Sequence, residues 1–288
     1  MTASPSGFGC NTYSYTLSHS APDCLTHLAG MGFREFELMM YPGHFWPPDA
    51  DAAAVKALAR TVEQLGSRIT TLNMPNVDMN VAGASKEMRN YTLGLLKQIV
   101  NLAGDLGVPA MILGPGKANP LFPAPRQRLL GYFFEALDIL VPLAEKRGTR
   151  IWVENMPFAF LPSIEDVLSA LENYGNDNIG VVYDVANGHF IDEDIALALR
   201  KCRQRLKLVH FSDTNNAVYR HDPVGRGTVP FQKVVPILAE IGHRQKPMLE
   251  IISTQPDSEI LSSAAALAAM GIGQAAGQAQ EKLHSTIK

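Results

Sequence analysis

Cysteine is scarce in this sequence of 288 residues, which contains only Cys10, Cys24 and Cys202. Three cysteines cannot all pair within one chain, and their wide spacing matches neither a disulfide framework nor a zinc site built from thiolates. We therefore expect three reduced thiols, as is typical of a protein in a reducing compartment.

Net charge is also low. Lys and Arg number 25 and Asp and Glu 28, which gives a formal net charge of −3, and charged residues make up only 18% of the chain. A nucleic-acid-binding module normally presents excess positive charge to phosphates, so we expect no nucleic-acid partner. The hydrophobic fraction of 46% is too high for a disordered chain.

Long apolar runs are absent as well. No stretch reaches the ~18–20 apolar residues that a membrane-spanning helix needs. The first residues, MTASPSGFG, lack a basic segment followed by an apolar core, so we expect no signal peptide. Together these absences predict a globular cytoplasmic protein that makes no membrane contact.

The glycines do not form a phosphate-binding fingerprint. No GxGxxG follows an early predicted strand, which argues against an open dinucleotide-binding sheet. The segment Gly114-Pro115-Gly116-Lys117 lacks the full GxxxxGKS/T spacing of a P-loop. Lys117 is therefore either a solvated loop lysine or an anion-binding residue at the mouth of a barrel.

The chain does contain a regular alternation of short apolar or β-branched runs with longer helical patterns. Strands are predicted at 9–15, 35–40, 68–74, 108–115, 149–157, 178–187, 206–214 and 246–253. Helices are predicted at 22–33, 51–66, 85–106, 126–147, 163–175, 192–205, 231–242 and from about 257. Such alternation implies a parallel sheet, because each helix returns the chain to the same edge.

Eight strand–helix units in a chain of this length predict a fold of the α/β class, namely a single (β/α)8 TIM barrel. We expect one domain over residues 1–288, with a core at about 8–272. The C-terminal tail is rich in Ala, Gly and Gln and is expected to lie outside that core.

Four successive strands of this pattern end in side chains that can bind a metal ion. Strand five ends in Glu154, strand six in Asp184, strand seven in His210 and strand eight in Glu250. In a (β/α)8 barrel the functional groups lie at the carboxyl ends of the strands. We therefore expect these four side chains to meet at the same height in the barrel.

Each of the four is flanked by apolar residues, so its side chain is expected to be partly or fully buried. An unpaired buried carboxylate is costly, and these strands offer few basic residues to pair with it. Taken singly, each residue has a structural alternative. Glu154 would be an ion-paired carboxylate, Asp184 a turn residue, His210 a core histidine and Glu250 a salt-bridge partner. Taken together they predict one divalent cation site. Oxygen-rich ligation favours Mn²⁺, with Mg²⁺, Co²⁺ or Zn²⁺ as alternatives.

Segments in order along the chain carry a family resemblance: GFREFEL at strand two, WVENMP at strand five, VYDVANGH at strand six, HFSDT and PVGRGTVPF around strand seven, and LEII at strand eight. With these segments the chain resembles the sugar phosphate isomerase/epimerase superfamily, also called the xylose isomerase-like barrels. The resemblance covers about residues 8–272. The superfamily includes ketose 3-epimerases, hydroxypyruvate isomerases, inosose dehydratases and isomerases, and DNA repair enzymes of the endonuclease IV type.

The resemblance implies the same metal ligands as the strand-end argument, namely Glu154, Asp184, His210 and Glu250. It also implies that Glu154 and Glu250 form a catalytic acid–base pair. One glutamate would remove a proton next to a metal-chelated carbonyl and the other would return one, with an enediolate between the two steps. We expect a metal-dependent isomerase or epimerase that acts on a small ketose-like compound derived from a sugar or polyol. A homo-oligomer is compatible with the family.

Substrate contacts are implied by the resemblance too. Many members carry a His three residues after the strand-six Asp, where this chain has Asn187, and the next imidazole belongs to His189. We expect these two residues to take the role of the family histidine. A basic residue of the loop after strand seven often reaches the substrate, which implies Arg220. Arg226 in the same loop is either a second contact or a loop-bracing ion pair.

Two residues of the first half complete the expected substrate-binding set, to which Lys117 also belongs. Glu37 ends strand two and is shared with the family as a barrel residue, either structurally paired or substrate-binding. His44 in the following loop either lines an apolar wall of the site or packs within a surface loop.

Three other functions are alternatives to the isomerase. A metal-assisted dehydratase of the inosose type would use the same site and expel a hydroxyl. A non-catalytic barrel would bind a ligand without bound metal. A nuclease of the endonuclease IV type needs about three metals and more His ligands than the strands offer, and the net charge disfavours DNA.

Overall fold

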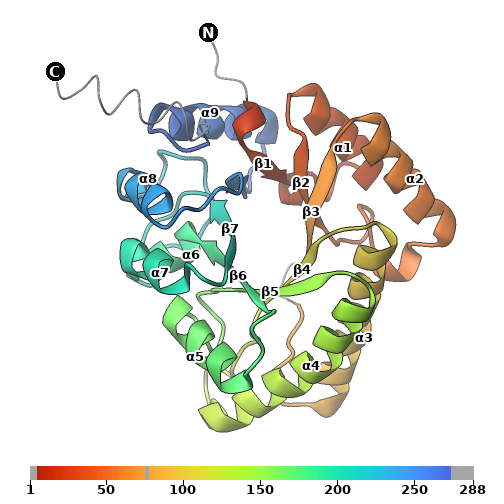
Figure 1. The fold of residues 1–288 in the computed structure, drawn as a ribbon, viewed down its shortest axis with the longest axis vertical. Helices are drawn as coiled ribbons and strands as arrows, with labels where there is room; N and C mark the ends of the chain where they lie inside the picture. Colours follow the sequence, from red (N-terminus) through yellow and green to blue (C-terminus); the bar gives the residue numbers. More distant parts are fainter. Residues whose placement is uncertain (1–4, 75–77, 274–288) are drawn as a thin grey trace.

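A closed barrel of parallel strands surrounded by helices makes up the fold of residues 5–74 and 78–273, which are the residues that the computed structural model describes (Figure 1). Within this part the eight strands pair in chain order, and β1 pairs with β8 to close the ring. The predicted (β/α)8 barrel is confirmed. The predicted C-terminal tail from residue 274 onward lies outside the described residues.

The strands are β1 (Gly9–Asn11), β2 (Glu35–Met39), β3 (Arg68–Asn73), β4 (Ala110–Leu113), β5 (Arg150–Glu154), β6 (Gly180–Asp184), β7 (Leu206–Phe211) and β8 (Met248–Leu249). The helices are α1 (Ala21–Gly30), α2 (Ala52–Gln64), α3 (Lys86–Asp105), α4 (Arg126–Lys146), α5 (Ile164–Tyr174), α6 (Val185–Phe190), α7 (Ile195–Cys202), α8 (Phe231–Glu240) and α9 (Pro256–Ala269). Short 3-10 turns lie at η1 (Pro5–Gly7), η2 (Tyr13–Tyr15) and η3 (Pro47–Asp49).

All eight predicted strands extend beyond the residues at which the strands end in the structure, and at two of them a polar side chain accounts for the difference. The predicted strand 178–187 ends at Asp184, because this side chain accepts a hydrogen bond from the Asn187 N–H and begins α6. The predicted strand 9–15 ends at Asn11, whose side-chain oxygen accepts from the Tyr13 N–H at 2.7 Å and turns the chain into η2. Both strands therefore end where a polar side chain accepts a hydrogen bond from a backbone N–H two or three residues later in the chain.

Helix boundaries follow local capping signals. A capping box formed by Ser163 and Asp166 opens α5, which ends at Gly175 in the left-handed conformation (φ 78°). Helix α8 continues through Pro236, as expected from its apolar pattern. None of the helices in the described part of the chain combines the length and apolar character that a bilayer crossing requires.

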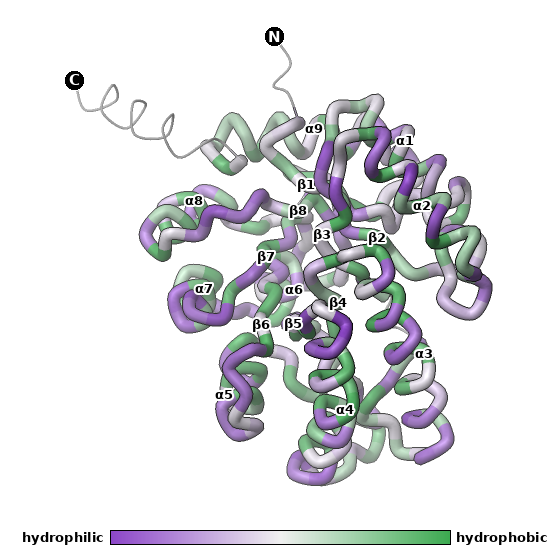
Figure 2. Tube along the Cα trace, turned by 45° about the vertical axis from the view of Figure 1, so that its right-hand side comes forward, coloured by the Kyte–Doolittle hydropathy of each residue, from purple (hydrophilic) through white to green (hydrophobic). Residues whose placement is uncertain are grey.

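The main hydrophobic core lies between the strands and the surrounding helices. In Figure 2 the outer helices such as α5 and α7 alternate between hydrophilic and hydrophobic residues, as helices with one buried face do. A second cluster comprises Ile112, Val182, Leu208 and Met248, with Trp152 packed against it. These residues come from neighbouring strands and fill the barrel interior, so the barrel is a packed core rather than a pore.

The three cysteines are free, as expected from their spacing, and all three are buried. Burial raises the pKa of the Cys24 and Cys202 thiols to about 12 and that of Cys10 well above its usual value. All three are consequently neutral thiols near pH 8 and are shielded from solvent.

We predict that the native protein does not react with Ellman's reagent at pH 8 on the timescale of minutes, whereas the chain in denaturant releases one equivalent of dye for each of its three cysteines. The measurement is absorbance after mixing, with and without guanidinium chloride. Rapid release of dye from the native protein would contradict the burial of these thiols.

Candidate metal centre

The predicted ligands form the layer directly above the apolar filling of the barrel. Side chains on a strand point to the same face at every second residue, so a residue two positions beyond an interior one also points inward. Each ligand stands two residues beyond an interior apolar residue of its strand: Glu154 after Trp152, Asp184 after Val182, His210 after Leu208 and Glu250 after Met248. Asp184 lies directly opposite His210 in the pairing of β6 and β7, and the ligand atoms of all four residues come together at this end of the barrel.

His210 lies at the centre of this layer. Its Nδ1 atom is 3.1 Å from Glu154 Oε1, 3.0 Å from Glu250 Oε2 and 3.7 Å from Asp184 Oδ2. One donor atom from each of the four residues lies within 4.8 Å of the others, and all four are buried. Among the described residues this is the one group of His, Cys, Asp and Glu with metal-binding spacing.

Asp184 shows that the donor set fits a cation. Its Oδ1 atom accepts from the Asn187 N–H at 2.7 Å, but its Oδ2 atom is buried without a hydrogen-bond partner. A buried carboxylate oxygen without a partner is costly, and a metal ion is one of the few groups that relieves this cost. Three carboxylates and one imidazole therefore have the chemistry and the spacing to hold a divalent metal ion.

Glu37 fixes the second nitrogen of the central imidazole. Glu37 Oε2 lies 3.2 Å from His210 Nε2 and accepts from the Thr71 hydroxyl at 2.6 Å. Glu37 Oε1 accepts from the side-chain amides of Asn11 and Asn73 at 2.6 and 3.0 Å. Burial raises the pKa of Glu37, but His210 and these donors outweigh it and hold the pKa below its usual value. Such a carboxylate behind a ligating histidine orients the ring toward the metal.

The pKa values of the carboxyl groups and of the imidazole depend strongly on one another. Burial lowers the pKa of His210, but Glu37, Glu250 and Glu154 together raise it well above its usual value. Burial raises the pKa of Glu250 to about 7 and also raises that of Glu154, despite the opposing effect of His210. Because a metal binds neutral imidazole and ionised carboxylates, binding at this centre would release protons.

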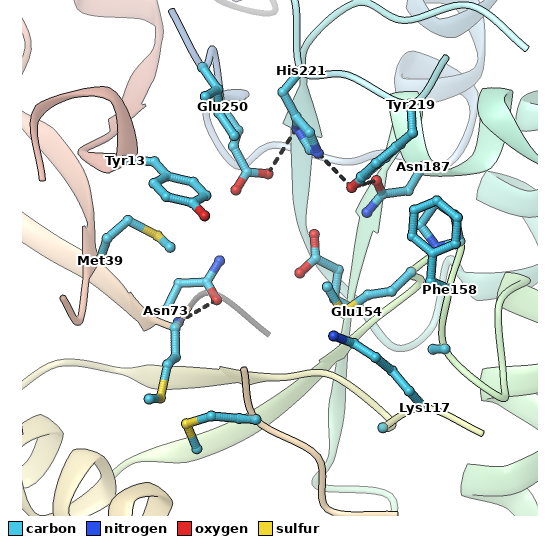
Figure 3. Close-up of a pocket in the computed structure, with 17 residues that line it drawn as sticks. Tyr13, Met39, Asn73, Lys117, Glu154, Phe158, Asn187, Tyr219, His221 and Glu250 are labelled. Atoms are coloured by element: carbon cyan, nitrogen blue, oxygen red, sulfur yellow. Dashed lines mark hydrogen bonds and ion pairs between the residues drawn. The ribbon is translucent and has the colours of Figure 1, made fainter. Parts of the chain in front are cut away.

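A cavity of about 180 Å³ opens above the ligand layer. Glu154 and Glu250 line it and point into it (Figure 3), whereas Asp184 and His210 are completely buried behind them. The cavity is thus bounded at its floor by two carboxylates from strands on different sides of the central imidazole. A substrate in the cavity would meet both.

Two of the expected substrate-binding residues line this cavity, namely Lys117 and Asn187. Glu37 does not, because it is completely buried behind His210. His44 is also buried away from the cavity, where its ring nitrogens lie 2.7 Å from the His19 carbonyl oxygen and 3.0 Å from the Thr12 hydroxyl. The polar contacts of the His44 ring are thus with the β1–α1 segment.

The remaining expected contacts lie outside the cavity lining. His189 Nε2 is 2.8 Å from the Thr228 hydroxyl. Arg220 is exposed to solvent. Arg226 forms an ion pair with Glu259 at the start of α9, which corresponds to the loop-bracing alternative.

The loop after β7 supplies cavity residues that were not among the expected site residues. Tyr219 donates a hydrogen bond to Asn187 Oδ1 at 2.7 Å, and its hydroxyl also lies 2.7 Å from His221 Nε2 (Figure 3). His221 Nδ1 lies 3.0 Å from the Ser212 hydroxyl and 3.6 Å from Glu250 Oε2. A Tyr-x-His pattern in the loop between β7 and α8 is the signal in the sequence that marks this pair.

We predict that Asp184→Asn weakens Mn²⁺ binding by more than roughly 10–100-fold. That is the usual loss when a group that only hydrogen-bonds to a metal ligand is removed, and Asp184 would bind the metal itself. The amide retains an oxygen that can cap α6, but it removes the charge and the unpartnered oxygen. Isothermal titration of the metal-free protein measures the change. Asp194→Asn is the matched control, because Asp194 caps α7 in the same way, outside the centre. Unchanged affinity in Asp184→Asn would contradict the assignment.

We predict that Glu37→Gln lowers the free energy of unfolding by about 1–3 kcal/mol, because the new amide N–H₂ faces groups that all donate to Glu37. Urea denaturation of the metal-free protein measures this. Glu63→Gln on the exposed side of α2 changes a Glu without such partners and is expected to shift stability by less than about 0.5 kcal/mol. Equal effects of the two variants would refute the role of Glu37.

Comparison with known proteins places this geometry in a family. The model of the xylose isomerase-like TIM barrel matches residues 25–270. The chain is 23% identical over 265 residues to the L-ribulose 3-epimerase of Mesorhizobium japonicum, a match that covers 90% of this chain and 86% of that protein. Two solved structures share the fold: an L-ribulose 3-epimerase (TM-score 0.77, 20% identity, 96% of this chain and 97% of that chain) and the IOLI protein with a zinc atom (TM-score 0.73, 18% identity, 91% and 95%).

The family match extends over most of the chain and includes all four strands that carry the candidate ligands. It confirms the resemblance inferred from the strand-end motifs. The chain belongs to the xylose isomerase-like TIM barrel family.

Proposed function

We propose that this protein is a divalent-metal-dependent isomerase or epimerase that moves a proton next to the carbonyl of a sugar-like substrate. The observation that carries the proposal is the pair Glu154 and Glu250, two carboxylates that reach one cavity directly above a buried metal-binding group. The named relatives support it, since they include an L-ribulose 3-epimerase and a fructoselysine 3-epimerase.

Glu154, Asp184, His210 and Glu250 would hold the metal ion. We propose Mn²⁺, because three of the four donors are carboxylate oxygens, although a related barrel has been solved with zinc. When bound, a divalent cation supplies Lewis acidity toward a carbonyl oxygen and so acidifies the neighbouring C–H. Glu37 acts through His210 by holding its Nε2 atom, and is a positioning residue.

Glu154 and Glu250 would handle the proton. Inverting a carbon centre requires a base on one face and an acid on the other, which is why two carboxylates are needed. Each has an oxygen close to His210 Nδ1, at 3.1 Å for Glu154 and 3.0 Å for Glu250, so the two carboxyl groups lie around the same ring nitrogen. One carboxylate oxygen would take the proton from carbon, and the other carboxyl group would return one.

Other residues of the cavity would bind and orient the substrate. Asn187 and Lys117 line the cavity, and Asn187 is held in place by its contacts to Tyr219 and to the Asn155 carbonyl oxygen. Tyr13 also lines the cavity, and its hydroxyl points into it (Figure 3). We propose Lys117, Asn187 and Tyr13 as hydrogen-bonding partners of the substrate.

We predict that the Mn²⁺-loaded protein exchanges one carbon-bound proton of a ketose with solvent in D₂O, followed by ¹H NMR. Glu154→Gln and Glu250→Gln should each lower the exchange rate by about 10²–10⁴-fold, because each removes one proton-transfer group. Metal content measured on the same samples separates lost proton transfer from lost metal. Exposed Glu240→Gln is the matched control.

The same experiment separates the isomerase from the dehydratase. Exchange with conversion to an isomer and no loss of water supports the proposal, whereas formation of a dehydrated product would favour the lyase. If the Mn²⁺-loaded protein exchanges no proton on any ketose, or if the Gln variants retain full activity, the proposal is wrong.

A further inference from the structure

Much of the polar lining of the cavity is already hydrogen-bonded within the protein. Asn73 donates to Glu37 Oε1 and accepts from the Met74 N–H at 2.7 Å. Asn187 accepts from Tyr219 and donates to the Asn155 carbonyl oxygen at 2.8 Å. These two amides therefore have their oxygen and one N–H engaged before any substrate enters.

Tyr219 and His221 are engaged in the same way. The Tyr219 hydroxyl donates to Asn187 and contacts His221 Nε2, while His221 Nδ1 contacts Ser212. The hydrogen bonds that a substrate can form with the described lining are thus concentrated at the two glutamates and the Tyr13 hydroxyl. This set suits a short hydroxy-carbonyl head rather than a long polyhydroxyl chain.

Apart from Lys117, the other described residues of the lining are apolar. They include four methionines, one phenylalanine and one isoleucine: Met39, Met74, Met79, Met156, Phe158 and Ile252. Methionine is flexible and polarizable, and it packs well against apolar groups of varied shape. A hydroxyl placed against these side chains would lose its water without gaining a hydrogen bond.

Phe158 provides an aromatic face where the cavity meets solvent. Its ring packs edge-on against Tyr219, with centroids 5.4 Å apart at 86°, and lies 5.7 Å from the ring of Phe190. Nevertheless, 60% of Phe158 is exposed, and Ile252 in the same lining is 40% exposed. An apolar ring held by two neighbours and still open to solvent is a surface on which an apolar group of a ligand can pack.

The charged groups do not provide a phosphate site. Lys117 is the one Lys or Arg among the described residues that line the cavity. Arg226 is engaged with Glu259, and Arg220 is exposed outside the lining. Tight recognition of a phosphate normally uses a bidentate guanidinium or several converging donors.

We infer that the substrate carries an apolar group, alkyl or aryl, on the side of the molecule away from the reacting carbonyl. The hydroxy-carbonyl head meets Glu154, Glu250 and Tyr13, and the apolar group packs on the methionines and Phe158. This inference rests on the proposed function, because it takes the two glutamates as the place where the head reacts. It adds the substrate class: a keto-sugar substituted with an apolar group rather than a sugar phosphate or an unmodified ketose.

A matched series tests the inference. The probes are L-ribulose derivatives that carry methyl, benzyl or phosphate on O5, so that their reacting ends are identical. For each compound, kcat/KM for proton exchange in D₂O and the Kd by isothermal titration are measured on the Mn²⁺-loaded protein. We expect the benzyl ether to have a kcat/KM about 10-fold or more higher, and a Kd about 10-fold or more lower, than the methyl ether, because a phenyl ring is buried. The phosphate should rank below the methyl ether.

Each outcome decides one of the two proposals. A phosphate that ranks first, or a benzyl ether no better than the methyl ether, overturns the inference and leaves the isomerase function standing. If no compound exchanges a proton, the proposed function fails, and the order of Kd values still decides whether the cavity selects an apolar group.

The variant Phe158→Ser tests whether the apolar group of the substrate packs on the Phe158 ring. It should reduce the ratio of benzyl to methyl kcat/KM by about 5-fold or more, because the ring loses its packing surface. Phe122→Ser is the matched control, since Phe122 is 86% exposed and lies outside the lining. An unchanged ratio in Phe158→Ser, or an equal change in both variants, counts against the assigned aromatic face.

Discussion

The position of the His210 ring is the constraint on which the rest of this site depends. One ring nitrogen faces Glu37, and the other faces Glu154, Asp184 and Glu250. An imidazole can satisfy carboxylates on both sides only if its plane is fixed, and the hydrogen bonds of Glu37 to Asn11, Thr71 and Asn73 fix it. Side chains from β1, β2, β3 and β7 thus set the orientation of one ring. The three carboxylates from β5, β6 and β8 are arranged around it.

The layered packing of the barrel explains how polar groups remain in its centre. The cluster of Ile112, Val182, Leu208 and Met248 excludes water below the ligand layer, and the alternation of each strand places the next inward residue above it. A shift of one residue in any of these strands would exchange the ligand for an outward-facing neighbour. The packing of the apolar layer therefore keeps the ligands in register.

Much of the metal centre could be predicted from the sequence because strands obey a simple period. Glu154, Asp184, His210 and Glu250 each end an apolar run, and a barrel brings such ends together. The ends of β1 and β6 were harder to predict. The side chains of Asn11 and Asp184 accept hydrogen bonds from backbone N–H groups further along the chain and so end these strands, and apolar periodicity does not indicate such local hydrogen bonds.

The substrate-facing residues were less accessible to prediction because loops have no period. Arg220 and Arg226 lie in the same loop as Tyr219 and His221, and the family resemblance favoured an arginine because a basic residue of this loop often reaches the substrate. In the structure Arg226 is drawn to Glu259, which lies far along the chain, and the Tyr219–His221 pair faces the cavity. Which side of a loop faces inward depends on partners such as Glu259 and Ser212, and a sequence pattern does not specify those contacts.

The closure of the ring by β1 and β8 has a consequence for the order in which the site is made. Gly9 pairs with Met248, and Ser14 contacts the Ile251 carbonyl oxygen, so the first and last strands meet only after nearly the whole barrel has been synthesised. Glu250 follows directly on the closing strand. A chain emerging from the ribosome therefore lacks both an intact ring and its fourth ligand until the same late moment.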